Sequence, residues 1–222
     1  MTEVTATSTP TIASTAPATT RPRSPRGQGE LLRADLLTAA LQLLAETGDR
    51  EDVSIRAIAK AAGVSPTAAY RHFEDRDALI DAACETCFAE FSAHMLERVG
   101  DLEDPFERLQ AAGQAYLDYS RNEDGHFRVL FTNPAHREKL DFPTAADAAG
   151  TAFQQLVSLI EDCLAAGAKP VISSDSVYLA FQVWSWVHGI AELHLSHPGQ
   201  PWPDVNQMVA DIAVALGLAG PG

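Results

Sequence analysis

The chain has 222 residues, of which 46% are apolar, and its formal net charge is −14. This length and apolar content allow a small domain that shares a buried core with a larger one. The chain has no run of about 18 uncharged apolar residues and no basic N-terminal region followed by an apolar stretch, so we predict neither a membrane span nor a secretory signal. We therefore expect a cytoplasmic protein without membrane contact.

The negative charge is concentrated in the C-terminal part of the chain. Residues 21–80 carry nine basic and nine acidic side chains, whereas residues 81–222 carry seven basic and twenty acidic ones. Exposed charges more than about 8 Å apart are largely screened at physiological salt. The overall acidity argues against non-specific coating of nucleic acid, but it leaves room for a local nucleic-acid site in the first third of the chain.

Residues 1–28 consist mainly of Thr, Ser, Pro and Ala, with few large apolar side chains. Such a segment buries too little surface to offset the entropy lost on ordering, so we predict a disordered tail. Near its end, Arg21, Arg23 and Arg26 alternate with Pro and Ser. This stretch suits either a basic arm that enters a DNA minor groove or a linker with no further role.

Apolar residues keep helical spacing from Glu30 to Thr47, and Gly48 is expected to end this first helix. Arg33, near its start, is a candidate phosphate contact. The apolar set that defines the helix is Leu32, Leu36, Leu37, Ala40, Leu43 and Leu44.

A second helix and a third follow in close succession. Ile55, Ile58, Ala59 and Ala62 define one apolar face, with Ser54 as the N-cap and Gly63 as the expected stop. Val64 is an apolar plug, and Ser65 and Pro66 supply the N-cap and first residue of the next helix. The short gap between the two helices is typical of a helix-turn-helix.

The third helix has two different faces. Ala69 and Phe73 lie on one face, and Thr67 and Arg71 lie roughly 160 to 200 degrees away at about 100 degrees per residue. Arg71 is suited to a bidentate pair with guanine, and Thr67 to a thymine methyl or a polar base edge. Tyr70 and His72 flank this face and are placed for phosphates. A plain amphipathic helical hairpin is the alternative interpretation.

The residues Tyr70, Arg71, His72, Phe73, Arg76 and Leu79 resemble the YxHFxxKxxL signature that closes the DNA-binding domain of the tetracycline-repressor (TetR) family, with Arg76 where the family usually has Lys. The resemblance covers Leu31 to Leu79. It implies an all-α fold with a helix-turn-helix domain over 29–74 and a ligand-binding and dimerisation domain over 75–222. It also implies an exposed loop over Asp49–Val53. The expected function is that of a homodimeric repressor, which binds a palindromic double-stranded DNA operator and is released by a small-molecule effector. The candidate DNA-binding residues are Arg33, Ser54, Arg56, Ser65, Pro66, Thr67, Ala68, Tyr70, Arg71, His72 and Arg76.

Helical patterns continue through the C-terminal region. We predict a long helix that joins the two domains, followed by five further helices. Their ranges are Asp75–Val99, a helix opened by Asp104 and Pro105, His126–Phe131 ended by Pro134, Thr144–Gly167, Ser174–Ser196, and a last helix from Val205 to Leu216.

The segment Ser174–Ser196 carries apolar residues almost all round its helical axis, so it must be covered on two sides. We expect its own domain to cover one side and a second subunit to cover the other. Gly189 and Ala191 would allow close approach of backbones. The stretch Trp184–Leu193, WSWVHGIAEL, resembles the Trp-His-Gly signature of a C-terminal domain in one branch of TetR-like regulators.

Large side chains on inward-facing stripes are candidates for a ligand pocket, although core packing explains most of them equally well. These ligand-binding candidates are Phe88, Phe91, Tyr116, Phe127, Phe131, Trp184 and His188.

Other possible sites have weaker support. Cys84 and Cys87 form a CxxC motif on a continuous helix, with no second pair for zinc, so structural thiols are favoured. The pairs His188 with Glu192 and His194 with His197 supply too few metal ligands on their own. We expect no metal and no cofactor. With no nucleophile elbow, phosphate loop or HExxH motif, an enzyme that acts on a small molecule in the C-terminal pocket is the second alternative. A non-specific architectural DNA binder is the third.

Overall fold

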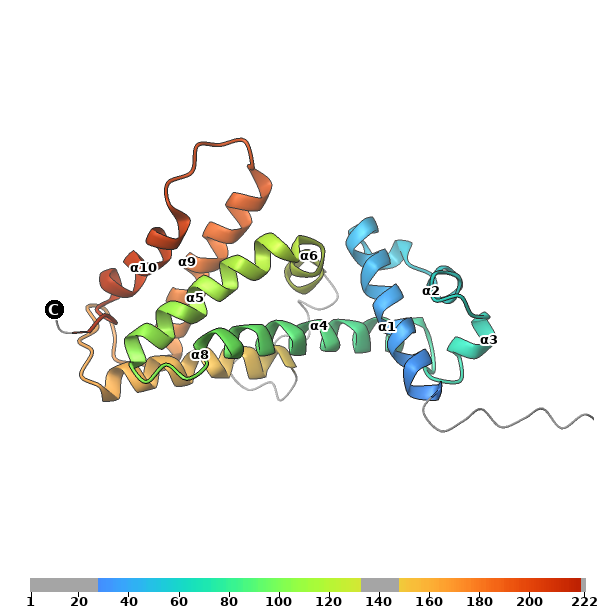
Figure 1. Ribbon diagram of the computed structural model, residues 1–222, viewed down its shortest axis with the longest axis horizontal. Helices are drawn as coiled ribbons and strands as arrows, with labels where there is room; N and C mark the ends of the chain where they lie inside the picture. The colour runs from blue at the N-terminus through green and yellow to red at the C-terminus, as the bar shows by residue number, and fades with distance from the viewer. Residues whose placement is uncertain (1–27, 133–147, 221–222) are drawn as a thin grey trace, which may run out of the picture.

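The computed structural model describes residues 28–132 and 148–220, and within these ranges the chain is all-α, as predicted. It contains nine α-helices and one 3-10 turn in the described residues, and no strand there. The Arg21 to Arg26 stretch, the expected stop at Pro134 and the expected helix start at Thr144 lie outside the described residues. Figure 1 shows a small helical head and a larger helical body joined by one long helix.

The head is built from α1 (Gln28–Thr47), the 3-10 turn η1 (Arg50–Asp52), α2 (Ile55–Ala61) and α3 (Pro66–Ala69). The first helix ends as predicted, because Gly48 takes a positive φ of 71°. The interior of the head is formed by Leu36, Leu44, Val53, Ile58, Ala69 and Phe73, all buried.

The segment Asp49–Val53 is only in part the exposed loop that the resemblance implied, because Asp49, Glu51 and Asp52 are exposed whereas Arg50 and Val53 are buried. The Asp49 side chain caps the turn η1 by accepting a hydrogen bond from the Glu51 amide at 2.9 Å. Val53 is fully buried, and Arg50 is 9% exposed. The turn is held inward because the partners of Arg50 lie on the next long helix, which the local sequence does not show.

That long helix is α4 (Arg76–Val99), and it connects the head to the body (Figure 1). Its N-cap is Asp75, whose carboxylate accepts a hydrogen bond from the Ala78 amide at 2.7 Å. Leu79, Ile80 and Ala83 near its start are buried, as are Phe88 and Phe91 further along. Since α4 packs against α1 at one end and against α5 (Pro105–Asn122) and α8 (Ala148–Ala165) at the other, one helix belongs to two cores.

The body consists of α5, α6, α8, α9 and α10. Three of these helices begin at an Asp N-cap, namely Asp104, Asp175 and Asp204, each of which accepts hydrogen bonds from amides of the first turn. The bounds are α5 Pro105–Asn122, α6 Asp124–Thr132, α8 Ala148–Ala165, α9 Ser176–Ser196 and α10 Val205–Leu216. No helix in the described parts of the chain is both long enough and apolar enough to cross a membrane.

The body closes where the end of α10 meets the connection between α8 and α9. Gly217 has a positive φ of 72°, and Leu218 behind it is fully buried. The Val171 amide donates a hydrogen bond to the Leu216 carbonyl at 3.2 Å. A Cβ added at Gly217 would collide with the backbone carbonyl of Lys169. Glycine is therefore required here for two reasons, the backbone conformation and the close approach of another segment.

Gly48 and Gly217 form a matched pair for a stability test, because their φ values are 71° and 72° but a Cβ at Gly48 would meet nothing within 4 Å. We expect Gly48→Ala to cost about 1 to 2 kcal/mol, the usual penalty for a left-handed residue with a side chain. Gly217→Ala should cost more, since it adds a clash with backbone. Urea unfolding of both variants at equal protein concentration measures the difference, and equal losses would contradict it.

Candidate nucleic-acid interface and internal cavity

The turn between α2 and α3 is fixed by local hydrogen bonds. Ser54 caps α2 through the Ala57 amide at 3.2 Å, as predicted. At the other end, the Gly63 amide donates to the Lys60 carbonyl at 3.1 Å and the Val64 amide donates to the Ala59 carbonyl at 2.8 Å. This pair of bonds is the Schellman arrangement, which needs the positive φ of 69° that Gly63 adopts. The turn therefore has one defined geometry.

The third helix begins at once after this turn. The Ser65 hydroxyl accepts a hydrogen bond from the Ala68 amide at 3.3 Å, and Pro66 occupies the first helical position. Ala69 and Phe73 are buried, whereas Thr67 and Arg71 are exposed, as the two predicted faces require. The structure thus leaves the proposed base-reading side chains free to reach a partner outside the molecule.

The remaining candidate residues of the head lie around this surface with different degrees of exposure. Arg56 and Tyr70 are exposed, and His72, Pro66 and Ala68 are half-buried. The Arg33 guanidinium lies 5.1 Å from the centre of the Phe73 ring, so its position is fixed beside α3. A cation held over an aromatic face gains attraction from the ring and stays able to donate hydrogen bonds outward.

Arg76, which stands at the Lys position of the family signature, is already paired within the head. Its guanidinium lies 2.9 Å from Asp77 and 3.3 Å from Glu51. The hydrogen bond with Asp77, followed by the one with Glu51, raises the pKa of Arg76 against a lowering effect of burial. Part of its charge is therefore offset before any phosphate approaches.

Arg50 links η1 to α4 in the same region. Its Nη2 lies 3.2 Å from an Asp81 oxygen and 3.4 Å from an Asp77 oxygen. Both carboxylates belong to the first turns of α4, and Arg50 is nearly buried. Together with the pair between Arg76 and Glu51, these contacts tie the head to the start of the connecting helix. The role of Arg50 is not apparent from the local sequence, because its partners are 27 and 31 residues away.

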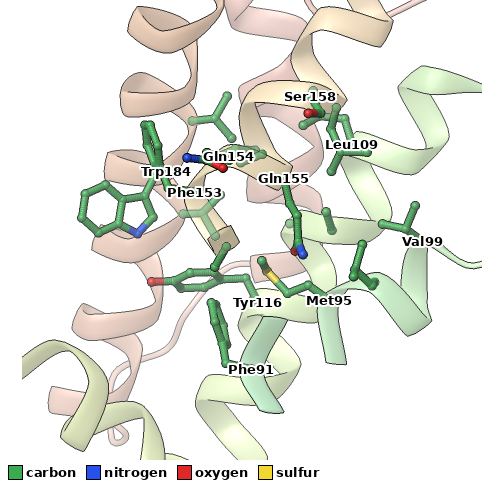
Figure 2. A pocket seen from close by; sticks show the side chains of 18 of the residues that line it. Phe91, Met95, Val99, Leu109, Tyr116, Phe153, Gln154, Gln155, Ser158 and Trp184 are labelled. Atoms are coloured by element: carbon green, nitrogen blue, oxygen red, sulfur yellow. The ribbon is translucent and has the colours of Figure 1, made fainter. Parts of the chain in front are cut away.

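The body contains a cavity of about 380 Å³ between α4, α5, α6, α8 and α9. Figure 2 shows Phe91 and Met95 entering it from α4, Tyr116 from α5, Phe153 from α8 and Trp184 from α9. Five of the seven predicted ligand-binding residues line it, namely Phe88, Phe91, Tyr116, Phe131 and Trp184. A cleft of this size with a mostly apolar wall is typical of a small-molecule site.

Two predicted residues, Phe127 and His188, lie behind the cavity wall and do not line it. Phe127 is fully buried, with its ring 5.6 Å from that of Tyr116. His188 Nδ1 lies 2.8 Å from the Tyr116 hydroxyl. Both residues support the wall, and the reason is that neighbouring rings of α5 and α6 occupy the space in front of them.

The Tyr116 hydroxyl is the centre of a buried polar group. Burial raises the pKa of Tyr116, and a hydrogen bond with Trp184 acts in the opposite direction. Because an indole nitrogen only donates, Tyr116 accepts from Trp184, and its own proton is then directed to His188 Nδ1. These two hydrogen bonds fix the orientation of three side chains, Tyr116 on α5 and Trp184 and His188 on α9.

Several residues on α8 line the cavity but were not among the predicted ligand-binding residues, including Phe153, Gln155 and Leu159. The helical spacing of Phe153, Leu156 and Ile160 would have shown an inward stripe on this helix. The opposing wall could not be foreseen, because it depends on how α4 and α8 cross.

Cys84, Cys87 and Cys163 are free and buried. Burial raises the pKa of Cys84 to about 11 and that of Cys87 to about 12. His194 lies against the Trp202 ring at 5.7 Å, and His197 Nδ1 lies 3.2 Å from the Leu193 carbonyl. Within residues 28–132 and 148–220, no three His, Cys, Asp or Glu side chains gather as a metal site.

The second helix of a DNA-binding helix-turn-helix enters the major groove, and here this motif stands on a larger helical body with a cavity. Residues 36–83 match the family described as bacterial regulatory proteins, tetR family, and residues 109–216 match the tetracyclin repressor-like C-terminal domain. The two matches together cover the head and most of the body.

Similar proteins agree with these matches. The chain is 34% identical over 85 residues to the HTH-type transcriptional regulator BetI of Brucella anthropi. The matched region covers 38% of this chain and 43% of BetI. It is 25% identical over 185 residues to an uncharacterized HTH-type transcriptional regulator of Mycobacterium tuberculosis, which covers 83% of this chain and 85% of that protein. The chain thus matches less than half of the length of BetI.

Solved structures show the same fold. The fatty acid degradation regulator FadR from Bacillus halodurans superposes with a TM-score of 0.68 at 15% identity, over 88% of this chain and 96% of that chain. The regulator PfmR from Thermus thermophilus gives a TM-score of 0.59 at 20% identity, over 82% and 96%. The chain belongs to the TetR family and is a helix-turn-helix, DNA-binding transcriptional regulator, in a family of regulators and not of enzymes.

The buried thiols and phenols predict how stability depends on pH. Burial raises the pKa of each of the three cysteines and of Tyr116 and Tyr119. Folding therefore favours the protonated forms of these five side chains. The contribution is complete below the unfolded thiol pKa of about 8.5 and is lost as the pH rises towards the folded values. We expect the urea midpoint to fall between neutral and strongly alkaline pH, with the native thiols inert to iodoacetamide at pH about 8. A rising midpoint, or fast labelling of the native chain, would contradict this.

Proposed function

We propose that this regulator represses transcription as a homodimer, which reads a palindromic operator and releases it when a small molecule fills the body cavity. The observation that carries this proposal is the orientation of α3, in which Thr67 and Arg71 face outward while Ala69 and Phe73 are buried. Operator binding would take place in the cytoplasm, where a bacterial chromosome is.

Two heads are needed because α3 has only four helical residues and presents few side chains to DNA. Two symmetric copies would place their reading helices in successive major grooves about 34 to 36 Å apart. Specificity against a genome of competing sites then comes from both half-sites together.

An apolar face of α9 supports the homodimer. Tyr178, Trp186 and Leu193 are 47%, 44% and 51% exposed, and large apolar side chains that gather on one face favour a contact with a partner. They fall within about 80 degrees of one another on the helix at about 100 degrees per residue. A Cβ at Gly189, between Trp186 and Leu193, would meet nothing within 4 Å, so the face has room for a second backbone. Trp184 lies on a different side of α9, where it lines the cavity.

The likeness of Trp184–Leu193 to the Trp-His-Gly branch of C-terminal domains also stays a proposal. His188 and Gly189 of this segment support the proposal because they lie on different sides of α9. His188 is bonded to Tyr116 in the body, whereas Gly189 lies on the outward side of the same helix.

Two helices would carry the effect of a ligand from the cavity to the head. α4 supplies Phe88 and Phe91 to the cavity and Leu79 and Ile80 to the head. α6 supplies Phe131 to the cavity and also packs against α1, where a Cβ at Gly125 would lie 3.0 Å from that of Ala45. A ligand that binds best when these helices are displaced would favour heads that no longer match the operator.

The N-terminal arm is a further DNA contact under this proposal. The start of α1 lies beside the reading segment, since a Cβ at Gly29 would be 3.8 Å from the His72 ring. Arg21, Arg23 and Arg26 precede this helix in the sequence, and under this proposal they would bind a flanking minor groove.

Arg71 tests the reading surface. We expect Arg71→Ala to weaken binding to the cognate operator by about 1 to 3 kcal/mol and to relax base preference at one position per half-site. The control is Arg98→Ala, which removes an equal charge from the exposed end of α4 in the body. Titration of operator and random duplex measures both effects, and an equal loss on the two duplexes would make Arg71 a phosphate contact only.

Trp186 tests the dimer. Trp186→Asp should raise the dimer dissociation constant by at least about tenfold, since it places a charge in a desolvated apolar contact. Val171→Asp is the control, because Val171 is equally apolar and 77% exposed but lies outside α9 and α10. Sedimentation velocity across a dilution series gives both constants. A Trp186→Asp chain that stays dimeric at wild-type concentrations would exclude this face as the interface.

A further inference from the structure

The cavity wall carries charge only in a neutralised form. Arg108 is a charged lining residue, and its Nη1 lies 2.7 Å from an Asp162 oxygen. A second charge brought into the cavity by a ligand would lose its hydration without a free counter-ion among the described lining residues, which is costly. The wall is therefore suited to an uncharged ligand.

Most hydrogen-bonding groups of the aromatic wall are already used. The Trp184 indole and the Tyr116 hydroxyl bond to each other, and Tyr116 also bonds to His188. These groups set the shape of the wall, but they have little capacity left for a ligand. Phe91 packs edge-on against Tyr116 with ring centres 5.3 Å apart, which fixes the lower wall in Figure 2.

Gln155 on α8 is different. The Ser92 hydroxyl donates a hydrogen bond to Gln155 Oε1 at 2.9 Å, so this contact holds the amide from its oxygen side. In the described part of the chain, the Nε2 group of Gln155 has no hydrogen-bond partner. Figure 2 shows the Gln155 amide among the lining side chains, next to Met95 and facing the same space as the aromatic residues. It is an oriented donor in a cavity whose wall is mostly apolar.

We infer that the cavity selects an uncharged ligand in which an oxygen acceptor, such as a ketone, stands between two bulky apolar groups. The oxygen accepts a hydrogen bond from Gln155 Nε2, and the apolar groups pack against the rings of Phe91 and Tyr116 and of Phe153 and Trp184. The inference rests on the proposed function only in that such a ligand would be the effector. The binding chemistry itself follows from the cavity.

Three probes that share two phenyl rings on one bridging carbon test this inference on the full-length protein. Benzophenone has the ketone, diphenylmethane lacks it, and 4-benzoylbenzoate adds a negative charge. We expect benzophenone to bind about 2- to 13-fold more tightly than diphenylmethane, the effect of one ordinary hydrogen bond. 4-Benzoylbenzoate should bind at least about tenfold more weakly than benzophenone. Displacement of the neutral fluorophore N-phenyl-1-naphthylamine gives all three constants.

The residue is tested with Gln155→Met, which keeps the length of the side chain and removes the donor. The preference for benzophenone over diphenylmethane should disappear in this variant. It should persist in Gln207→Met, the matched control on α10, where Gln207 bonds to Asp211 outside the cavity. A preference that survives in Gln155→Met would overturn the assignment of Gln155.

The probe comparison uses the unchanged chain, so it is decisive even if a variant misfolds. Equal binding of benzophenone and diphenylmethane, or equally tight binding of the carboxylate, would overturn the inference. Operator release is measured separately by titrating benzophenone into the protein–operator complex. Tight ketone-dependent binding without release would contradict the proposed function and leave the inference about the cavity intact.

Discussion

The architecture depends on one helix that is shared by two cores. α4 has 24 residues and contains neither Gly nor Pro, so it runs for about 36 Å without a natural hinge. Its first turns complete the interior of the head with Leu79 and Ile80, and its later turns form a wall of the cavity with Phe88 and Phe91. A change in the cavity that displaces this helix must therefore also displace the packing of the head.

Ion pairs also connect the head to the start of α4. Arg50 is held by Asp77 and Asp81, so the turn before α2 follows the first turns of α4. The contact between α6 and α1 provides a second connection, and Phe131 brings that helix into the cavity wall. A cavity of about 460 Å³ is lined by the end of α1, Arg50 of η1, α6 and α9, beside the contact between α1 and α6. The head is thus braced against the body at two places, through α4 and through α6.

The helix ends were predictable because their causes are local. Ser54, Gly63, Ser65 and Pro66 act through bonds to residues at most four positions away, and the structure confirms each of them. The turn at Arg50 was not predictable, since it is held by residues about 30 positions further on. For the cavity, helical spacing indicated which side chains face inward, but it could not show that Phe127 and His188 would be covered by other rings. Gln155 was missed because its role depends on Ser92, 63 residues away.

The central claim is that two outward-facing copies of α3 read a symmetric DNA site. Selection of bound duplexes from a random library by the full-length protein tests this most directly. The account predicts enrichment of an inverted repeat whose half-site centres lie about 10 to 10.5 base pairs apart, or a multiple of this spacing. Recovery of sequences without a common motif, or of a single half-site without symmetry, would contradict it.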